Sequence, residues 1–521
     1  MNREPMIDRL RGEGSPWDIV VIGGGATGLG CAVDAAARGY RTVLLEQADF
    51  GKGTSSRSTK LAHGGVRYLR QGQVGLVVEA LRERARLMAN APHLVRPVSF
   101  VVPTYRRFER AYYGLGLGLY DILAGRCAIG RSRVLTRAGV CARVPGVNAA
   151  GLRGGVRYFD ACFDDARLAV NLAATAADLG AVVINYARVT AIVHEGDAVA
   201  GVRVEDGESG ESWEIRARAV INAAGVFADG VRRLDDPAAE PTLTLSRGAH
   251  VVLDGAFLGG DTALLVPRTD DGRVVFAIPY RGRVLVGTTD TRASAAELEP
   301  HARDDEIEFL LAHAARYLAR APERADVRSA FAGLRPLLDA DGERPTARLS
   351  REHRVLVSAR GLVTIVGGKW TTYRKMAEDT VDQAAHVGGL DATLSPTRTL
   401  RIHGYDGAPD GMGTGPLARY GSDAARIEAL AREDPELALE VSGAPGLLAA
   451  EVVWAVRKEM ARTVEDVLAR RTGLLFVDAR AAIAAAPAAA QLIAAELGRD
   501  TDWARAEAAR FAALAAHYLP A

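Results

Sequence analysis

One segment near the amino terminus constrains the fold of this chain more than any other. Residues 17–46 follow the order apolar strand, Gly-rich turn, Ala-rich helix, apolar strand. The turn carries Gly23, Gly25 and Gly28 in the spacing G-x-G-x-x-G, and Glu46 closes the second strand. Glycines at this spacing let backbone N–H groups approach a pyrophosphate at the helix N-terminus and let the helix pack closely on the strand. The segment therefore predicts a dinucleotide-binding βαβ unit.

Features outside the glycines indicate which dinucleotide is bound. The carboxylate of Glu46 can accept hydrogen bonds from an adenosine ribose, and it would repel a 2′-phosphate. The fingerprint alone fits both FAD and NAD, but the sequence holds only one complete copy of it. A βαβ unit at the extreme N-terminus, with distant returning segments, fits an FAD domain that is interrupted by a substrate domain. We therefore expect FAD as the cofactor.

Length and composition exclude several classes of protein. A chain of 521 residues is expected to form more than one domain, and 48% hydrophobic with 25% charged residues is typical of soluble globular proteins. Lys and Arg number 65 against 64 Asp and Glu, so we expect no nucleic-acid partner. The four cysteines form no CxxC pair, which predicts free thiols in a reducing compartment and no bound metal.

The sequence shows no targeting or membrane-spanning segment. The first residues, "MNREPMIDRLRGEG", are charged and lack the apolar region of a signal peptide. No run approaches the roughly 20 apolar residues that a membrane-spanning helix needs. These patterns predict an intracellular protein, unless it is held at a membrane surface.

Strand and helix patterns recur along the rest of the chain. Strand-like segments lie near 181–225, and short strands with Asp-Gly and Arg-Gly turns recur from about 240 to 290, which predicts an antiparallel sheet. Residues 362–385 return to strand, Gly turn and helix. A Gly- and Pro-rich segment at 403–416 is expected to be a linker. The chain beyond it is helical in pattern, and Pro487 is expected to start a new helix.

These patterns predict an α/β fold. It combines a Rossmann-like FAD-binding domain, an inserted substrate domain built on an antiparallel sheet, and a C-terminal all-helical domain. The expected FAD-binding domain comprises residues 1–80, 155–235 and 335–395, the substrate domain 81–154 and 236–334, and the helical domain 396–521.

The stretch "TSSRSTKLAHGGVRYL" at 54–69 combines hydroxyls, cations, a histidine and two glycines. Its hydroxyls can hydrogen-bond the pyrophosphate and ribityl chain of FAD, and its glycine pair lets the backbone pass close to a ring. Arg67 and Tyr68 would then point beyond the cofactor. The alternative is a solvated surface loop. The hydroxyls belong to Thr54, Ser55, Ser56 and Ser58, and the glycines are Gly64 and Gly65.

Two further segments carry single candidate residues. His250 enters a strand in "SRGAHVVL", where a lone histidine is more often structural than catalytic. Arg335 stands between Gly333 and Pro336, which predicts a constrained turn. An exposed arginine is usually solvated, so Arg335 becomes a stronger candidate site residue only together with the segment described next.

That segment is "GGKWTTYRKMAED". Gly367 and Gly368 end a strand, Lys369 projects, and Thr371 or Thr372 is expected to cap the following helix. A helix N-terminus aimed at the flavin would stabilise the negative charge of the reduced ring. The alternative is a plain strand–turn–helix with a surface lysine.

Taken together, the motifs resemble those of the FAD-dependent glycerol-3-phosphate dehydrogenases of the aerobic, quinone-linked type. The chain is similar to that family, in the family's order, in "VVIGGGATG", "SSRSTKLAHGGVRYL", "YFDACFDDARL", "INAAGVFAD", "GTTDT", "GLRPL" and "GGKWTTYRKMAED". Residues 451–474 resemble the family's helical C-terminal domain. The likeness covers most of residues 16–475, whereas 476–521 show no pattern beyond helix.

The resemblance implies oxidation of sn-glycerol 3-phosphate to dihydroxyacetone phosphate, by hydride transfer to FAD and passage of electrons to a membrane quinone. The C2 hydroxyl proton needs a base, for which His250 and His63 both remain candidates, and Arg335 can steady the developing alkoxide. A near-dianionic phosphate favours more than one cation. The implied substrate contacts are Arg67, Tyr68, Arg335, Lys369 and Thr289.

The expected FAD contacts combine the pattern arguments with the resemblance. Two departures from the family are mild: Arg247 stands where the family often has Lys, and Tyr280 where it often has Trp. The expected contacts are Gly23, Gly25, Gly28, Glu46, Thr54, Ser55, Ser56, Ser58, Gly64, Gly65, Ala224, Gly225, Gly368, Lys369 and Thr371.

Use of a quinone implies contact with a bilayer. Residues 100–133 interleave Phe, Tyr and Leu with arginines, a composition that suits an interfacial anchor reaching anionic headgroups. The alternative is an amphipathic element of the substrate domain. We expect a cytoplasmic protein held peripherally at the inner face of the cell membrane, without calcium regulation because no EF-hand loop is present. The oligomeric state stays open, with a homodimer as one option.

Other functions compete with this one. A glycerol-3-phosphate oxidase would pass the electrons to oxygen, and another amino-acid-oxidase-like flavoenzyme would use an arginine at 335 for a carboxylate. A non-catalytic flavin-binding protein would have no need to keep Arg67, His250, Arg335 and Lys369 together.

Overall fold

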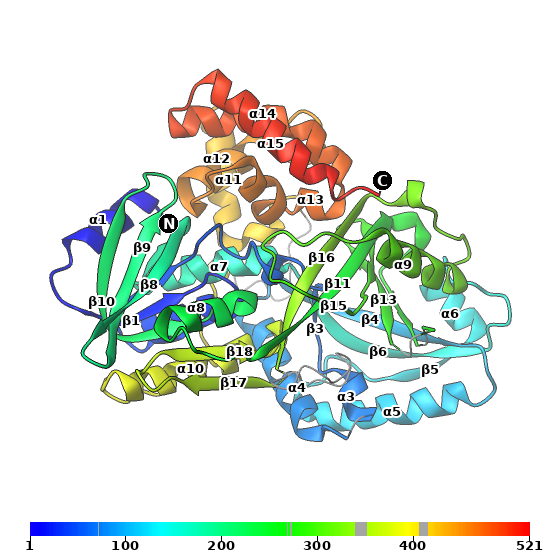
Figure 1. The fold of residues 1–521 in the computed structure, drawn as a ribbon. Coiled ribbons are helices and arrows are strands. Elements are labelled where there is room, and N and C mark those ends of the chain that lie inside the picture. Colours follow the sequence, from blue (N-terminus) through cyan, green and yellow to red (C-terminus); the bar gives the residue numbers. More distant parts are fainter. Residues whose placement is uncertain (71, 268, 271–272, 339–351, 406–414, 521) are drawn as a thin grey trace.

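The computed structural model describes residues 1–70, 72–267, 269–270, 273–338, 352–405 and 415–520, without the side chains of Arg67 and Arg70. Two sheets lie side by side, and the C-terminal helices form a separate layer against them (Figure 1). The predicted α/β class, with a second antiparallel sheet and a helical C-terminal domain, is confirmed.

The first sheet has the strand order β17-β18-β10-β1-β2-β7, with a β8–β9 hairpin attached to β10. Strands β1, β2, β7, β10 and β18 run parallel, because long crossovers connect them. The bounds are β1 Trp17–Ile22, β2 Thr42–Leu45, β7 Val182–Ile184, β8 Ala187–Glu195, β9 Ala198–Asp206, β10 Ser212–Asn222, β17 His353–Val357 and β18 Val363–Gly367.

Helices cover the two faces of this sheet unequally. One face packs on α2 (Ala26–Ala37), α7 (Asp165–Asp178) and α10 (Tyr373–Val387), whose small and aliphatic side chains form a buried cluster with alternate strand residues. The other face packs on α1 (Arg3–Gly12) and the β8–β9 hairpin. Since both faces are covered, β1 and β2 carry continuous apolar runs at 19–22 and 43–45, as expected for a parallel sheet.

The second sheet is mainly antiparallel and has the order β15-β11-β14-β13-β12-β4-β6-β3, with β16 paired to β11 and β5 to β6. The sheet predicted from the turns between 240 and 290 is confirmed. Its strands are β3 Leu61–Ala62, β4 Val95–Thr104, β5 Arg133–Thr136, β6 Gly154–Phe163, β11 Leu243–Asp254, β12 Ala263–Val266, β13 Val275–Tyr280, β14 Arg283–Gly287, β15 Thr291–Ala293 and β16 Ser329–Leu338.

The second sheet draws strands from ranges that the sequence patterns had assigned to the FAD-binding domain. β6 pairs along its whole length with β4, and β3 pairs with β6. The chain therefore enters the second sheet before residue 80 and leaves it only after residue 163. Such long-range pairing leaves no local signal, because a strand of one sheet reads like a strand of the other.

Shorter helices surround the second sheet. Helix α5 forms the lower edge of the molecule in Figure 1, beside α3 and α4 and far from the C-terminal helices. The bounds are α3 Val66–Arg70, α4 Val74–Asn90, α5 Glu109–Ala124, α6 Arg137–Arg143, α8 Ala228–Asp235 and α9 Asp304–Tyr317.

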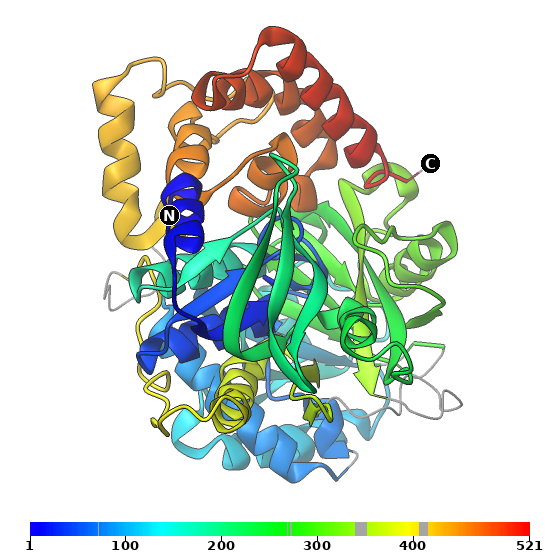
Figure 2. The same cartoon turned by 60° about the vertical axis from the view of Figure 1, so that its left-hand side comes forward.

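The C-terminal helices lie together on one side of the molecule in both views (Figures 1 and 2). The prediction that Pro487 starts a helix is wrong, because Pro487 lies inside α14. Buried alanines of α14 pack against α12 and α15, and this packing offsets the hydrogen bond that proline removes. The expected linker at 403–416 falls partly on residues 406–414, outside the described residues. The bounds are α11 Ala424–Glu433, α12 Ala449–Glu459, η9 Asp466–Arg471, α13 Leu474–Val477, α14 Ala479–Leu497 and α15 Thr501–Ala516.

Candidate active site

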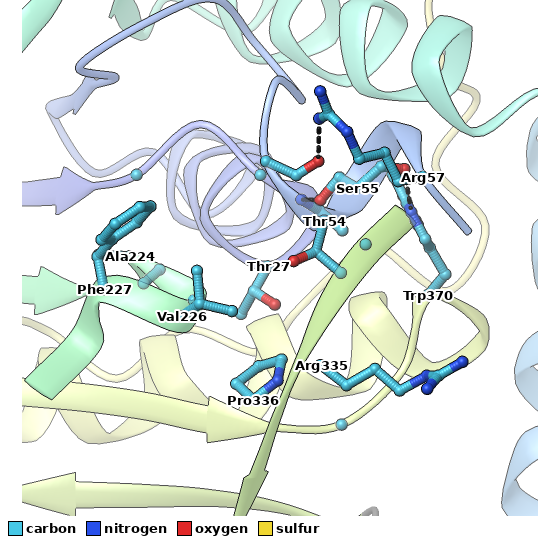
Figure 3. Close-up of a pocket in the computed structure, with 18 of the residues that line it drawn as sticks. Thr27, Thr54, Ser55, Arg57, Ala224, Val226, Phe227, Arg335, Pro336 and Trp370 are labelled. Carbon is cyan, nitrogen blue, oxygen red and sulfur yellow. Dashed lines mark hydrogen bonds between the residues drawn. The ribbon is translucent and has the colours of Figure 1, made fainter. Parts of the chain in front are cut away.

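A cavity lies where the carboxyl ends of β1, β2, β10 and β18 meet the second sheet. In an open parallel sheet this edge is where ligands bind, because loops and helix N-termini converge there. β11 and β16 complete the wall through His250 and Arg335. Figure 3 shows Ala224, Val226 and Phe227 toward one end of the pocket, and Arg335 and Trp370 toward the other.

The glycines of the fingerprint are crowded as a dinucleotide site requires. A Cβ on Gly28 would lie 1.8 Å from the carbonyl oxygen of Gly23, so the close packing of α2 on β1 depends on glycine there. Gly23 has φ +110°, and a Cβ on it would lie 2.6 Å from the carbonyl oxygen of Ala223. Gly23 and Gly25 line the cavity beside the N-terminus of α2. This cradle fits the pyrophosphate of a dinucleotide such as FAD.

The hydroxyls of the 54–58 stretch divide into two groups. Thr54, Ser55 and Ser58 line the cavity, whereas Ser56 is fully buried and does not reach its wall. Ser55 Oγ accepts a hydrogen bond from the first helical amide, Ala26 N, at 2.9 Å. The Ser55 carbonyl accepts from Trp370 Nε1 at 2.8 Å, a bond visible in Figure 3. Ser55 therefore ties the fingerprint helix to the segment around residue 370.

Glu46 stands at the end of β2 on the cavity wall. Its carboxylate accepts hydrogen bonds from Gly24 N at 2.6 Å and from Ala48 N at 2.8 Å. Burial raises the pKa of Glu46, and the two amide donors oppose this shift. The amides hold the carboxylate in place, and its contact with a ribose stays a prediction.

The prediction that Arg335 lies in a constrained turn is wrong, because Arg335 is part of strand β16 and pairs with Ser246 of β11. Among the described strands β16 pairs with β11 alone, so the missing N–H of Pro336 breaks no second ladder there. The guanidinium donates to Thr288 Oγ1 at 2.9 Å and to the carbonyl oxygen of Thr289 at 3.2 Å. These bonds hold the guanidinium at the cavity wall.

His250 is a buried residue of β11 that lines the cavity. Its Nε2 lies 2.9 Å from Thr59 Oγ1, and its ring stacks on Phe331 with 5.0 Å between centroids. Burial lowers the pKa of His250 well below the ordinary value, and the charges of Arg335 and Lys60 lower it further. The imidazole is therefore neutral near pH 7, so one ring nitrogen carries no proton, and the lowered pKa makes it a weaker base than a free histidine.

His63, the second candidate base, also lines the cavity. Its backbone N–H donates to Thr371 Oγ1 at 3.2 Å, which joins the two predicted site segments directly. Both histidines therefore stay in place as candidates.

Thr372 stands at the N-cap position of α10 without a side-chain capping bond. Its hydroxyl donates to the carbonyl oxygen of Lys369 at 3.3 Å.

Lys369 and Tyr68 lie together in the cavity wall. The Nζ atom of Lys369 is 3.9 Å from the centre of the Tyr68 ring, a cation–π distance. The side chain of Arg67 lies outside the described residues. Thr289 does not reach the cavity, because its hydroxyl donates to Glu306 Oε1 at 2.9 Å and accepts from Ala249 N. The hydroxyl of the neighbouring Thr288 instead accepts from Arg335, whereas Thr289 contacts Arg335 through its carbonyl oxygen alone.

The remaining predicted contacts are split between the wall and the layer behind it. Ala224, Gly225, Gly368 and Thr371 line the cavity. Gly64 and Gly65 do not: a Cβ on Gly64 would lie 2.5 Å from Tyr120 Oη, and one on Gly65 would lie 2.2 Å from the Tyr68 ring. The glycine pair thus allows close passage beside two tyrosines.

Several lining residues were missed in the sequence patterns. Thr59 carried the same signal as Ser58, a hydroxyl in the same stretch, and it is the partner of His250. Lys52 and Arg57 also line the cavity, but a cation in a loop has no distinguishing pattern of its own. Arg188 reaches the wall from β8, a position that only the tertiary structure reveals.

Family models match both parts of the chain. Residues 18–374 match the model described as "FAD dependent oxidoreductase". Residues 362–504 match the model described as "C-terminal domain of alpha-glycerophosphate oxidase".

Named relatives match along most of their length. The chain is 38% identical to the mitochondrial glycerol-3-phosphate dehydrogenase of Mus musculus, over 94% of this chain and 71% of that protein. It is 41% identical to a glycerol-3-phosphate dehydrogenase of Mycobacterium leprae (strain TN), over 92% of this chain and 85% of that protein. A crystal structure of glycerol-3-phosphate dehydrogenase from Bacillus halodurans complexed with FAD superposes with a TM-score of 0.80 at 29% identity, covering 99% and 97% of the two chains.

Proposed function

Because the chain belongs to the family of FAD-dependent glycerol-3-phosphate dehydrogenases, we propose that it oxidises sn-glycerol 3-phosphate to dihydroxyacetone phosphate. The supporting observation is one cavity that joins a dinucleotide cradle to a neutral buried histidine and to cationic side chains. Bound FAD supplies the acceptor for the hydride that leaves C2 of the substrate.

The substrate phosphate is proposed to bind between cations. Lys369 over the Tyr68 ring and Arg335 in β16 both line the cavity, and a near-dianionic phosphate gains affinity and orientation from more than one such group. Arg67, two residues beyond the Gly64–Gly65 pair, is proposed as a further cation. An amino-acid substrate would offer a carboxylate and would leave part of this positive charge without a partner.

His250 is proposed as the base that removes the proton of the C2 hydroxyl. Its pKa is held low, its Nε2 is oriented by Thr59, and its ring is fixed on Phe331, so a neutral imidazole is presented at a fixed angle. Arg335 then stabilises the developing alkoxide. His63 is the competing base.

FAD is proposed to be held by the fingerprint glycines and the segments that face them. Gly23 and Gly25 with the N-terminus of α2 suit the pyrophosphate, and Glu46 suits the adenosine ribose. Gly368 and Thr371 lie at the start of η7 (Trp370–Thr372), which precedes α10 and suits a group that becomes negatively charged on reduction.

A membrane quinone is proposed as the final electron acceptor, which requires contact with a bilayer. No helix among the described residues is long and apolar enough to cross a membrane. Helix α5 and its N-cap residue Phe108 offer a different contact: Phe108, Leu115 and Ile122 are 79%, 80% and 76% exposed. These residues recur at helical spacing on the face opposite the buried Leu117 and Tyr120.

Exposed arginines flank α5 at both ends. Arg106 and Arg107 precede the helix, and Arg126 and Arg131 follow it. An amphipathic helix with these neighbours suits the interface of an anionic bilayer, where the apolar face enters the headgroup region and the arginines meet phosphates. We propose that α5 holds the protein peripherally at the inner face of the cell membrane.

The catalytic proposal is tested by anaerobic addition of glycerol 3-phosphate to the purified flavoprotein. The flavin absorbance near 450 nm should bleach, as for flavins in general, and an oxidised flavin after prolonged incubation would refute the proposed substrate. Turnover is then compared with a quinone analogue and with oxygen while peroxide is measured. Faster turnover with oxygen and stoichiometric peroxide would favour an oxidase, the alternative that the match of residues 362–504 keeps open.

The membrane contact is tested by co-sedimentation with vesicles of phosphatidylcholine and phosphatidylglycerol. Leu115→Glu and Ile122→Glu should weaken vesicle binding without changing turnover with a soluble acceptor, because neither side chain approaches the cavity. Leu439→Glu is the matched control, since Leu439 is exposed on the C-terminal domain. Equal binding by all three variants would contradict the role of α5.

A further inference from the structure

Residues 49–57, here called the cofactor loop, follow β2 and include the first hydroxyls of the 54–58 stretch. Lys52, Gly53, Thr54, Ser55 and Arg57 of this loop line the cavity. Two of them, Lys52 and Arg57, are cations whose side chains are largely buried. A buried cation needs an opposite charge nearby. The loop's own carboxylate, Asp49, pairs with other arginines, as described below.

Arg57 holds the shape of the loop and is itself held from outside. Its Nη1 donates to the carbonyl oxygens of Lys52 and Gly53, so one guanidinium closes the turn. Its Nη2 donates to Glu299 Oε1 at 2.6 Å, and Tyr518 Oη donates to the same oxygen at 2.6 Å. Tyr518 follows α15 near the C-terminus and is fully buried.

Lys52 is held by the same domain through a different residue. Its Nζ lies 2.5 Å from Glu465 Oε2, and Arg470 donates to the other oxygen of Glu465 at 2.6 Å. Burial favours protonation of Glu465, but the charges of Arg470 and Lys52 outweigh burial and lower its pKa to about 2. Glu465 is therefore ionised at any physiological pH and available to pair with Lys52.

The start of the loop has a third attachment. Asp49 is buried and accepts from Arg471 Nη1 at 2.5 Å and Nη2 at 2.8 Å, and Arg470 Nε also donates to it. Both arginines belong to η9 of the C-terminal domain. The loop is thus attached near its beginning, its middle and its end, and each attachment involves residues that come after position 460.

We propose that Glu465 and Tyr518 are positioning residues through which the C-terminal helical domain holds the cofactor loop in its FAD-binding shape. This inference rests on the proposed role of the loop in binding FAD. Through Tyr518 it assigns a function to residues 476–521, where the sequence showed helix and nothing more. Loss of either contact leaves Lys52 or Arg57 less well paired, and the loop relaxes away from the pyrophosphate site.

The experiment measures FAD affinity directly, with the full-length protein stripped of flavin and titrated with FAD while flavin fluorescence is recorded. Tyr518→Phe removes one hydroxyl and keeps the ring that packs on Phe476. Glu465→Gln removes one charge and keeps the side-chain volume. Each variant should raise the Kd for FAD by roughly tenfold, as expected when a buried polar partner is lost.

The matched control is Glu208→Gln. Glu208 joins the first sheet to the C-terminal domain through two bonds from Arg462, at 2.7 and 2.6 Å, but it does not touch the cofactor loop. The Kd of Glu208→Gln for FAD should stay within about twofold of the wild-type value, because the loss of a partly exposed ion pair has a small effect.

Two results would overturn the proposal. The first is an unchanged Kd in both Tyr518→Phe and Glu465→Gln. The second is an equal rise in Glu208→Gln, which would mean that domain docking in general, and not these two contacts, supports the site. A variant that fails to fold is recognised by its thermal transition, and the other variant then decides. Failure of wild-type protein to bind FAD at all would instead refute the proposed function.

Discussion

Replacement of Arg335 by alanine tests the proposed chemistry most directly. The side chain donates to Thr288 Oγ1 at 2.9 Å, to the carbonyl of Thr289 at 3.2 Å and to Ser246 Oγ at 3.4 Å. Only the first of these has a short hydrogen-bond distance. The loss of folding free energy should therefore be about 1–2 kcal/mol, small enough for the protein to stay folded.

The loss in catalysis should be much larger. A donor aimed at a developing oxyanion contributes about 2.7–4 kcal/mol, which corresponds to 10²–10³ in rate. Charge-assisted contact with the substrate adds about 1.5–3 kcal/mol to binding. We therefore expect Arg335→Ala to lower kcat/KM by about three orders of magnitude or more, while the flavin stays bound because no fingerprint residue is altered.

The assay is stopped-flow reduction of the bound flavin by glycerol 3-phosphate under anaerobic conditions, with the flavin-to-protein ratio measured first. Arg335→Lys serves as the comparison, since it keeps the charge and loses the planar fork, and it should fall between the wild type and alanine. A wild-type flavin reduction rate in Arg335→Ala would refute the role of the guanidinium. Loss of flavin from the variant would place Arg335 in the cofactor site instead.

Further predictions concern the base, the fingerprint and a partly exposed cluster of His403 with two aspartates. His250→Gln should lower the flavin reduction rate by at least about 10² at pH 7, and His63→Gln by less than tenfold; the reverse order would make His63 the base. Gly28→Ala should abolish FAD binding, measured by flavin absorbance, because its Cβ would lie 1.8 Å from a carbonyl oxygen. The control Gly230→Ala should retain FAD, because the space around Gly230 is open. Asp178 and Asp423 raise the pKa of His403 from 6.5 to about 9. The stabilisation from this cluster is therefore complete below pH 6.5 and lost as the pH rises through about 9, so the thermal midpoint of the wild type should fall over this range more steeply than that of His403→Gln. If the thermal midpoint fell equally with pH in the wild type and in His403→Gln, the assignment of this stabilisation to His403 would be contradicted.

The local parts of the site were predictable because their signals lie within short segments. The fingerprint between 17 and 46 reports a strand, a turn and a helix that touch one another, so crowding at Gly28 follows from spacing alone. The hydroxyls of Thr54, Ser55 and Ser58 lie on the cavity wall, and their contact with FAD stays a prediction. Ser56 does not reach the wall, since the 3₁₀ turn over residues 54–56 points its side chain into the core.

The parts that failed depend on partners distant in the chain. Gly333 and Pro336 are turn formers locally, but pairing with β11 over ten residues places Arg335 in a strand. Pro487 is a helix starter locally, but packing of α14 on its neighbours carries the helix through it. In both cases tertiary contacts supply more free energy than the local preference of one or two residues.

The sequence by itself therefore determined the cofactor class, the order of the motifs and the identity of a part of the cavity-lining residues, because these follow from residue type and short spacing. Only the tertiary structure decided which side chains face one another. Thr59 contacts His250, which lies 191 positions later in the sequence. Tyr518, near the C-terminal end, contacts Glu299 and Arg57. Such pairs have no local signature, since each partner alone is an ordinary polar residue. Their roles arise when folding buries them together, where an unpaired polar group is too unfavourable to persist.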